Sequence, residues 1–423
     1  MCSSDLTRFG RKQFKDVLRP AISLAQDGFP VTELVHNAWK ESEKLLQKDV
    51  SAAKTYLPGG AAPEVGALFR NPDLAWAYSQ IARSGRRAYY QGQIADRLVS
   101  YSQSLGGTLT KADLQEYSSE WVTPISTTYR GWTVYEIPPN GQGIAALAML
   151  NLMEQFSLGE FGHNSARALH ALIESKKLAY ADMHQHVADP RFAKVPVRQI
   201  LSKTYAAERA RLIDPAKANG TISSGVTANS GTDTTYLCVV DAEGNMVSYI
   251  QSNFNAFGSG LVAPGTGFAL QNRGGLFSLD RAHPNILAGR KRPQHTIIPA
   301  FMEKENIRIA FGIMGGWNQS QAHAQFVSNL VDHHLNIQSA LEAPRFTKLT
   351  FPGVDVQVER RVPEEVRKEL AARGHQLTVI GSYAQAVWGG QAVMRDFQSR
   401  VNYGASDPRK DGAAVPELGP RRK

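Results

Sequence analysis

The chain has 423 residues, of which 42% are hydrophobic and 20% are charged, and its formal net charge is +9. This length exceeds the usual size of one hydrophobic core, so we expect two domains or two intertwined halves. No apolar run reaches the ~18 residues of a membrane span, and no nucleic-acid-binding motif accompanies the basic charge, so neither a membrane nor nucleic acid is an expected partner. The start of the chain lacks the basic and apolar regions of a signal peptide, which leaves the compartment open.

The first half of the chain reads as mainly helical after a polar, basic lead-in over residues 1–20. Two short alternating segments, 125–128 and 132–137, predict a hairpin of strands. Apolar residues at helical spacing predict helices over residues 21–50 with a break at 28–30, and over 71–81, 91–104, 111–117, 144–153, 163–187 and 206–213.

The clearest internal boundary is the segment 216–233, which consists mainly of Ala, Asn, Gly, Ser and Thr. Such a composition buries too little apolar surface to order itself, so we expect a flexible loop. We therefore divide the chain into a helix-rich part, 21–233, and a strand-rich part, 234–423.

The second part opens with a predicted hairpin of strands 234–241 and 246–252. A strand over 307–313 then ends at Gly315 and Gly316, and a helix over 321–335 follows. The remaining pattern predicts strands over 354–358, 376–379, 385–388 and 391–395, with a helix over 363–373.

No metal or cofactor is expected from the motifs. The serine-hydrolase elbow, the P-loop and the dinucleotide fingerprint are all absent. Two clusters of potential metal ligands stand in predicted helices, where residues two apart point away from each other, so we interpret them as helix faces. These clusters are Asp182, His184 and His186, and Asp332, His333 and His334.

The junction of Asp233 and Thr234 offers a different chemistry. If this bond were cut, Thr234 would carry a free α-amine beside its own hydroxyl, so that base and nucleophile stand on one residue. Ser252, on the neighbouring predicted strand, could hydrogen-bond the new terminus. The backbone N–H groups of Gly315 and Gly316 could stabilise an oxyanion.

Residues 234–241, continuing through Gly244, Asn245, Val247 and Ser248, resemble the start of the small subunit in the γ-glutamyltransferase family. Further stretches fit in family order, namely residues 106–114, 138–143, 177–182, 315–316, 342–346 and 404–409. Members of this family are N-terminal nucleophile hydrolases that cleave themselves before a threonine. The resemblance begins near Ala21, so we expect the family's N-terminal part to be missing from this chain.

The resemblance implies an α+β fold, a four-layer αββα sandwich, and a heterodimer of large (21–233) and small (234–423) subunits cut from one precursor. It makes Thr234 the nucleophile and the bond between Asp233 and Thr234 the cleavage site. Ser252 corresponds to the family's second threonine, and Gly315 and Gly316 correspond to its oxyanion hole.

The expected substrate site departs from the family pattern. Phe254, Arg273 and Leu276 stand where members hold the glutamyl α-amino group with polar or acidic residues, and Tyr236 replaces a usual histidine. Without a carboxylate there, a buried α-ammonium group would lack its counter-charge, at a cost of several kcal/mol.

The stretches around Asn255 and around residues 295–301 look more like the branch that includes an oxamate amidohydrolase. We therefore expect an amidohydrolase or acyltransferase that takes a γ-glutamyl-type or small acidic amide, with Arg273 holding a carboxylate. Two alternatives stay open: unchanged γ-glutamyl specificity, and an unprocessed, inactive relative such as a basic surface-binding protein.

Overall fold

The structure is a computed structural model that describes residues 2–222 and 233–417. It divides into two compact units: the first comprises Met1–Trp121 and Asn255–Asn272, and the second comprises Val122–Phe254 and Arg273–Lys423. Strands from both sides of Asp233 join the second unit, so the compact units do not coincide with the two expected subunit parts, whose boundary at Asp233 stays a prediction. Of the loop predicted over 216–233, residues 223–232 lie outside the described residues. None of the described helices is long and apolar enough to cross a membrane.

The first unit is helical, and it includes most of the expected lead-in. Residues 1–20 were predicted to be poorly defined, but helices occupy most of this stretch. An aromatic cluster of Trp39, Tyr56, Phe69 and Phe257 ties the segment 255–272 to this unit. Its elements are α1 (Cys2–Phe9), α2 (Phe14–Asp27), α3 (Glu33–Glu41), α4 (Glu43–Leu46), α5 (Val50–Tyr56), α6 (Pro72–Ser84), α7 (Arg86–Tyr90), α8 (Gln93–Ser104) and α9 (Lys111–Gln115), with the strands β1 (Phe29–Pro30) and β2 (Leu68–Phe69).

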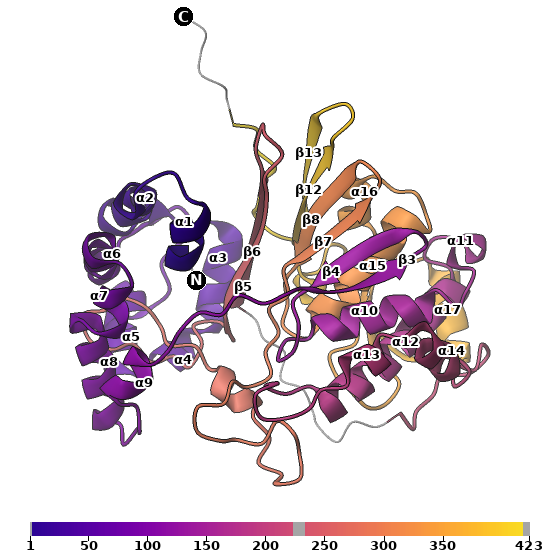
Figure 1. Ribbon diagram of the computed structural model, residues 1–423, viewed down its shortest axis with the longest axis horizontal. Helices are drawn as coiled ribbons and strands as arrows, with labels where there is room; N and C mark the ends of the chain where they lie inside the picture. The colour runs from indigo at the N-terminus through magenta and orange to yellow at the C-terminus, as the bar shows by residue number, and fades with distance from the viewer. Residues whose placement is uncertain (1, 223–232, 418–423) are drawn as a thin grey trace, which may run out of the picture. The chain divides into compact units, whose positions relative to one another are not determined.

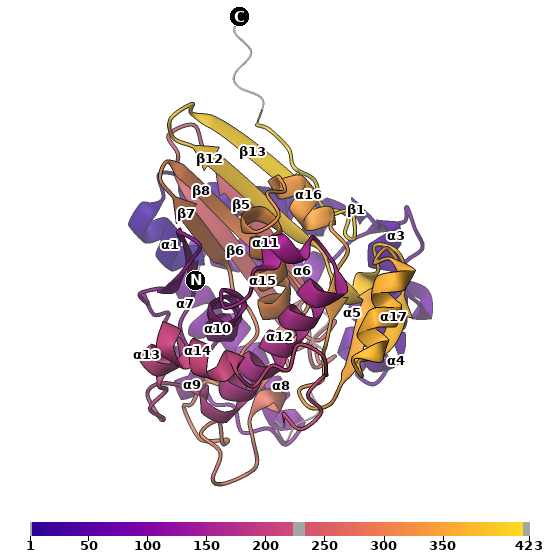
Figure 2. The same cartoon turned by 90° about the vertical axis from the view of Figure 1, so that its right-hand side faces the viewer.

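The second unit contains a six-stranded antiparallel sheet in the order β13-β12-β8-β7-β4-β3 (Figure 1). Figure 2 shows four of these strands, β13, β12, β8 and β7, side by side. The predicted hairpin of the first half is confirmed as its β3–β4 edge. The strand predicted over 385–388 is wrong, because residues Gln385–Val387 form a 3-10 turn. The strands are β3 (Ile125–Tyr129), β4 (Trp132–Glu136), β7 (Ala300–Lys304), β8 (Ile307–Ile313), β12 (Gly390–Asp396) and β13 (Val401–Ser406).

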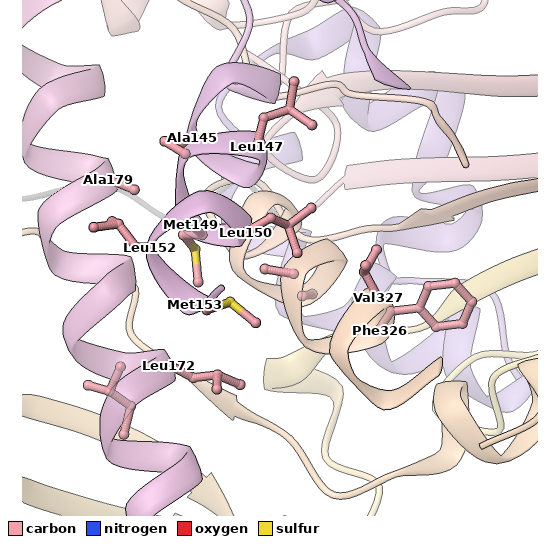
Figure 3. Packing of buried hydrophobic residues seen from close by; sticks show 14 of the residues in the cluster. Ala145, Leu147, Met149, Leu150, Leu152, Met153, Leu172, Ala179, Phe326 and Val327 are labelled. Atoms are coloured by element: carbon pink, nitrogen blue, oxygen red, sulfur yellow. The ribbon is translucent and has the colours of Figure 1, made fainter. Parts of the chain in front are cut away.

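Helices α10 (Gly143–Met153), α12 (Ala166–His186) and α15 (Asn318–Val331) pack together on one face of this sheet (Figure 1). Figure 3 shows their shared apolar core, in which Met149 and Leu150 of α10 lie among side chains of α12 and α15. Every residue of α10 is buried. A helix surrounded by protein needs no polar face, which explains why its sequence is apolar all round.

The remaining elements of this unit surround that core. They are α11 (Leu158–Phe161), α13 (Val197–Ile200), α14 (Lys203–Ala210), α16 (Ile337–Glu342), α17 (Glu364–Ala372), the 3-10 turn η2 (Arg273–Leu276), and a small sheet of β9 (Phe346–Thr347), β10 (Asp355–Glu359) and β11 (Gln376–Ile380).

The predicted hairpin after Asp233 is confirmed as β5 (Asp233–Val240) and β6 (Met246–Phe254), and it packs against β8 and β12 of the large sheet (Figure 1). Along β5, Thr234 and Tyr236 are buried whereas Thr235 and Leu237 are exposed, as expected for a strand with one covered face. The Tyr236 ring lies directly over Gly312 of β8, where a Cβ atom would be only 2.4 Å from the ring. The close approach of the two sheets therefore requires glycine at position 312.

Contacts further along the hairpin give the direction of β5 across the large sheet. Arg395 of β12 donates to the carbonyl of Ala242 at 3.2 Å, and the thiol of Cys238 lies at the backbone of Val393. These two contacts show that β5 runs in the same direction as β12. Because β12 and β8 are antiparallel, the start of β5 lies nearer to the C-terminal end of β8. Three layers, helices and two sheets, thus lie within the second unit, and the fourth layer of the expected sandwich stays a prediction.

A buried pair of histidines connects α12 to the segment after α17. The Nε2 atom of His170 lies 2.8 Å from the carbonyl of Asp214, so it carries the proton and donates. Its Nδ1 atom is then the acceptor for Nε2–H of His375, at 2.8 Å. Burial, and to a smaller extent the nearby His170, Lys177, Arg373 and Lys348, together lower the pKa of His375 to about 3. Both rings are therefore neutral in the folded protein near pH 7.

We predict that Gly312→Ala destabilises the protein by about 1–3 kcal/mol, because the new methyl group overlaps the Tyr236 ring. Urea unfolding of the purified protein measures this change. Gly381→Ala is the matched control, because a Cβ atom there meets nothing within 4 Å. Equal unfolding midpoints for the two variants would refute the close packing of the hairpin on β8.

The buried histidine pair predicts a specific acid sensitivity. The pKa of His375 falls from its ordinary 6.5 to about 3 on folding, so between these values only the unfolded chain takes up the proton. Its contribution to stability is complete above pH 6.5 and is lost as the pH falls toward 3, with a slope of about 1.4 kcal/mol per pH unit.

His375→Gln keeps a donor for His170 but removes the titration, so its unfolding free energy should fall less steeply than wild type between pH 6.5 and 5. Gly381→Ala, which changes no titratable group and meets nothing within 4 Å, should retain the wild-type slope. Parallel slopes for His375→Gln and wild type would contradict the assignment.

Candidate active site around Thr234

Thr234 lies at the start of β5 with its side chain on the covered face of the hairpin. The residue is 8% exposed, and its Oγ1 atom has no hydrogen-bond partner among the described residues. The direction of β5 carries Thr234 about 7 Å beyond Tyr236 along the strand, toward the C-terminal end of β8. The segment that follows β8 there contains Gly315 and Gly316. Thr234 and the pair Gly315 and Gly316, all predicted from the sequence as site residues, therefore lie toward the same end of the packed sheets.

Ser252 lies on the strand next to Thr234, as the sequence predicted, and the structure pairs the two residues directly in the β5–β6 ladder. Residues opposite each other in an antiparallel pair project to the same face, so the two hydroxyl side chains are neighbours. The Oγ atom of Ser252 accepts a hydrogen bond from the N–H of Phe254 at 2.9 Å, which fixes the orientation of the serine.

The ladder is irregular at the predicted cleavage point. Asp233 pairs with Phe254 and Thr234 pairs with Ser252, so Asn253 is an extra residue opposite the bond between Asp233 and Thr234. Such a bulge bends one strand and locally breaks the pairing. Phe254 has a φ of 78°, in the left-handed region that a bulky side chain rarely adopts. The backbone irregularity thus coincides with the predicted scissile bond.

Gly315 and Gly316 have φ values of 112° and 55°, which favour glycine. A Cβ atom on Gly315 would lie 2.1 Å from the ring of Trp388, so this position also requires glycine for space. Neither N–H group donates a hydrogen bond to another described residue. Two adjacent N–H groups without acceptors can bind an anionic oxygen.

Gln142, which the sequence analysis noted only within the stretch 138–143, connects this glycine pair to the rest of the site. Its side chain is fully buried, and its Nε2 atom donates to the carbonyl of Gly316 at 2.7 Å and to that of Thr296 at 2.6 Å. A buried glutamine with both amide hydrogens used is a rigid connector. The proline-rich sequence around it gave no signal for this role.

Arg273, predicted to bind substrate, lies in η2 and is 8% exposed. Its Nη1 donates to the hydroxyl of Thr296 at 3.0 Å, and its guanidinium lies 5.5 Å from the Phe254 ring. The structure therefore brings Arg273 and Phe254 together, and Thr296 links the arginine to Gln142. The sequence analysis assigned no role to Thr296, which it mentioned only as part of the stretch 295–301 that resembles one branch of the family.

Two further predicted substrate residues lie differently. Leu276 packs against the main apolar core, and its carbonyl accepts a hydrogen bond from Asn285 at 2.7 Å. Asn255 belongs to the first unit, where its backbone N–H donates to the side chain of Asn272 at 3.1 Å.

Two arginines, Arg273 and Arg292, act electrostatically on the buried His295. Burial, and to a smaller extent the charges of these arginines, together lower the pKa of His295 to about 3. The imidazole is therefore neutral near pH 7. A carboxylate fits this environment and an ammonium group does not.

The side-chain clusters considered as metal ligands are held by other partners. Asp182 forms an ion pair with Arg209, and Asp332 with Arg130. Contrary to the sequence prediction, residues 332–334 follow α15 rather than lying inside it.

A third cluster, formed by His170, Glu174 and His375, has its ligand atoms within 4.8 Å of one another. The ammonium of Lys177 lies 2.5 Å from Glu174, where a cation would bind, and Nε2 of His375 carries a proton. This cluster therefore does not fit a metal ion as it stands.

Comparison with known proteins supports one family. The glutathione hydrolase-like YwrD proenzyme of Bacillus subtilis is 36% identical over 418 residues, which cover 97% of this chain and 78% of that protein. The oxamate amidohydrolase proenzyme of Klebsiella pneumoniae is 32% identical over 403 residues, covering 94% of this chain and 75% of that protein. The crystal structure of cephalosporin acylase from Bacillus halodurans matches with a TM-score of 0.90 and 40% identity, over 99% of this chain and 77% of that one.

The fold is therefore that of the N-terminal nucleophile hydrolases, with mixed helices and sheets. The gamma-glutamyltranspeptidase family model matches residues 3–417, so the likeness begins well before Ala21, where the sequence analysis placed its start. The chain belongs to the gamma-glutamyltranspeptidase family of hydrolases.

Proposed function

We propose that this protein is a self-processing amidohydrolase whose nucleophile is Thr234. The observation that carries the proposal is the placement of Thr234. Thr234 pairs with Ser252 at the open end of the β5–β6 hairpin, the end that lies toward Gly315 and Gly316. The strand pairing is irregular at the bond between Asp233 and Thr234. The names of the relatives, which include hydrolase, amidohydrolase and acylase proenzymes, support cleavage of a precursor.

In the proposed processing step, Thr234 Oγ attacks the carbonyl of Asp233 and the bond to the Thr234 nitrogen breaks. The resulting ester is hydrolysed, which leaves the carboxylate on Asp233 and a free amine on Thr234. The large and small subunits stay together as a heterodimer, because the β5–β6 hairpin packs on a sheet built from both parts. The complete four-layer sandwich belongs to this proposal.

In the proposed reaction, Thr234 Oγ attacks the substrate amide while its own α-amine takes the hydroxyl proton. The N–H groups of Gly315 and Gly316 stabilise the oxyanion, and Ser252 orients the amine. The protonated amine then passes its proton to the leaving nitrogen, which leaves an acyl ester on Thr234. Water, activated by the same amine, hydrolyses the ester and releases the carboxylic acid.

The proposed substrate is an amide whose acyl chain ends in a carboxylate and lacks an α-ammonium group. Arg273 would hold this carboxylate beside the neutral His295. Two like unit charges ~5 Å apart at an effective dielectric constant of ~20 repel by about 3 kcal/mol, so an α-ammonium group near Arg273 is disfavoured. The cephalosporin acylase and oxamate amidohydrolase names support amides other than γ-glutamyl ones.

We predict that the purified protein separates on a denaturing gel into two fragments, residues 1–233 and 234–423. N-terminal sequencing of the smaller one should begin Thr-Thr-Tyr-Leu. Thr234→Ala should stay full-length, because no hydroxyl is left to attack the Asp233 carbonyl. Thr235→Ala, at the exposed neighbour, should be processed like wild type. A persistent single band in wild type, without activity, would favour the unprocessed, inactive relative.

We also predict a preference for glutaryl p-nitroanilide over γ-glutamyl p-nitroanilide, which differs by an α-ammonium group. Release of p-nitroaniline should give a kcat/KM at least about 10-fold higher for the glutaryl compound, because Arg273 repels the ammonium. Arg273→Ala should raise KM for glutaryl p-nitroanilide by at least about 10-fold, since a charge-assisted hydrogen bond contributes about 1.5–3 kcal/mol.

Arg395→Ala is the control for this experiment, because Arg395 is also buried and lies under the same hairpin at the end away from Thr234. It should leave the KM near the wild-type value. A wild-type preference for the γ-glutamyl compound would instead support unchanged γ-glutamyl specificity.

A further inference from the structure

The segment between β8 and α15 carries both N–H groups of the proposed oxyanion hole, and Asn318 donates hydrogen bonds to two of its carbonyl groups. Asn318 is the first residue of α15 and is fully buried. Its backbone N–H donates to the carbonyl of Gly315 at 2.8 Å. Its side-chain Nδ2 donates to the carbonyl of Met314 at 3.3 Å.

These two carbonyls belong to the two peptide groups that also contain the N–H groups of Gly315 and Gly316. The Met314 carbonyl and the Gly315 N–H share one peptide, and the Gly315 carbonyl and the Gly316 N–H share the next. In a trans peptide, C=O and N–H point in opposite directions. A residue that holds both carbonyls on one side therefore turns both N–H groups toward the other side.

From this geometry we propose that Asn318 is the positioning residue of the oxyanion hole. The proposal rests on the proposed function, in which Gly315 and Gly316 bind the oxyanion. Glycine has no side chain to restrict its peptide planes, and both glycines have positive φ values. Preorganised donors act without reorganisation during the reaction, so their fixed direction contributes to the rate.

Asn318 also fixes the other side of the segment. Its Nδ2 donates to the carbonyl of Val387 at 3.1 Å, and the next residue, Trp388, places its ring against Gly315. The same amide thus holds the glycine pair and the loop that covers it. Both amide hydrogens point at carbonyls, so an acceptor cannot replace this side chain.

The test uses Asn318→Asp, which keeps the shape but replaces the donor by an acceptor, and Asn318→Ala, which removes the amide. Asn329→Ala is the matched control: it is a buried asparagine of the same helix whose amide donates to the carbonyl of Ala340, away from the glycines. Turnover of glutaryl p-nitroanilide is measured per processed molecule, with the processed fraction taken from a denaturing gel.

Both Asn318 variants should lose about 10- to 100-fold in kcat with KM within about 2-fold, since removal of a whole oxyanion donor costs about 10²–10³ in kcat. Inhibition by 4-boronobutanoic acid, which forms a tetrahedral adduct, should weaken in parallel with kcat. Inhibition by glutarate, a ground-state ligand, should not change. Asn329→Ala should stay near wild type in all three measurements.

Unchanged kcat, a rise in KM alone, or equal weakening of boronate and glutarate binding would overturn the proposal while leaving the proposed function intact. So would unfolded or unprocessed Asn318 variants beside a processed Asn329→Ala, since that result assigns Asn318 a structural role. Absence of turnover in wild type would overturn both proposals together.

Discussion

The packing of the β5–β6 hairpin against β8 and β12 is the constraint on which the candidate site depends. The Tyr236 ring can lie against the large sheet only because Gly312 has no side chain. This contact sets the height of β5 above β8, and the contacts of Cys238 and Ala242 set its direction. Thr234 is then carried to the end of β8 by the regular rise of the strand. A shift of one residue would turn its hydroxyl to solvent.

Buried amide side chains connect the loops near Gly315 and Gly316, and the guanidinium of Arg345 adds hydrogen bonds to the carbonyls of Val387 and Trp388. Gln142 connects Gly316 to Thr296, and Asn318 connects Met314, Val387 and the glycine pair. Amides suit this purpose because they donate to backbone carbonyls without the desolvation cost of a charge. Each of these bonds lies in a region without solvent, where an unpaired carbonyl would be costly, so the loops have few alternative arrangements.

In the proposed function, the positive charge of Arg273 binds the carboxylate of the substrate. Arg273 is buried beside Phe254, and burial together with the charges of Arg273 and Arg292 lowers the pKa of His295. The reaction centre and the acyl-binding region are joined through Thr296, which accepts from Arg273 by its hydroxyl and from Gln142 by its carbonyl. Specificity and catalysis therefore share one hydrogen-bonded framework in this proposal.

The sequence by itself determined the elements with strong periodicity or clear turn residues: α10, α12, the β3–β4 edge and the β5–β6 hairpin, with Thr234 and Ser252 on neighbouring strands. Those features depend on local spacing, which the chain carries in itself. Only the tertiary structure decided the roles of Gly312, Gln142 and Asn318, and the division into units that crosses Asp233. These features depend on which segments meet across the two sheets. The sequence around a glycine or a buried amide carries no local pattern that predicts which distant residue it will contact.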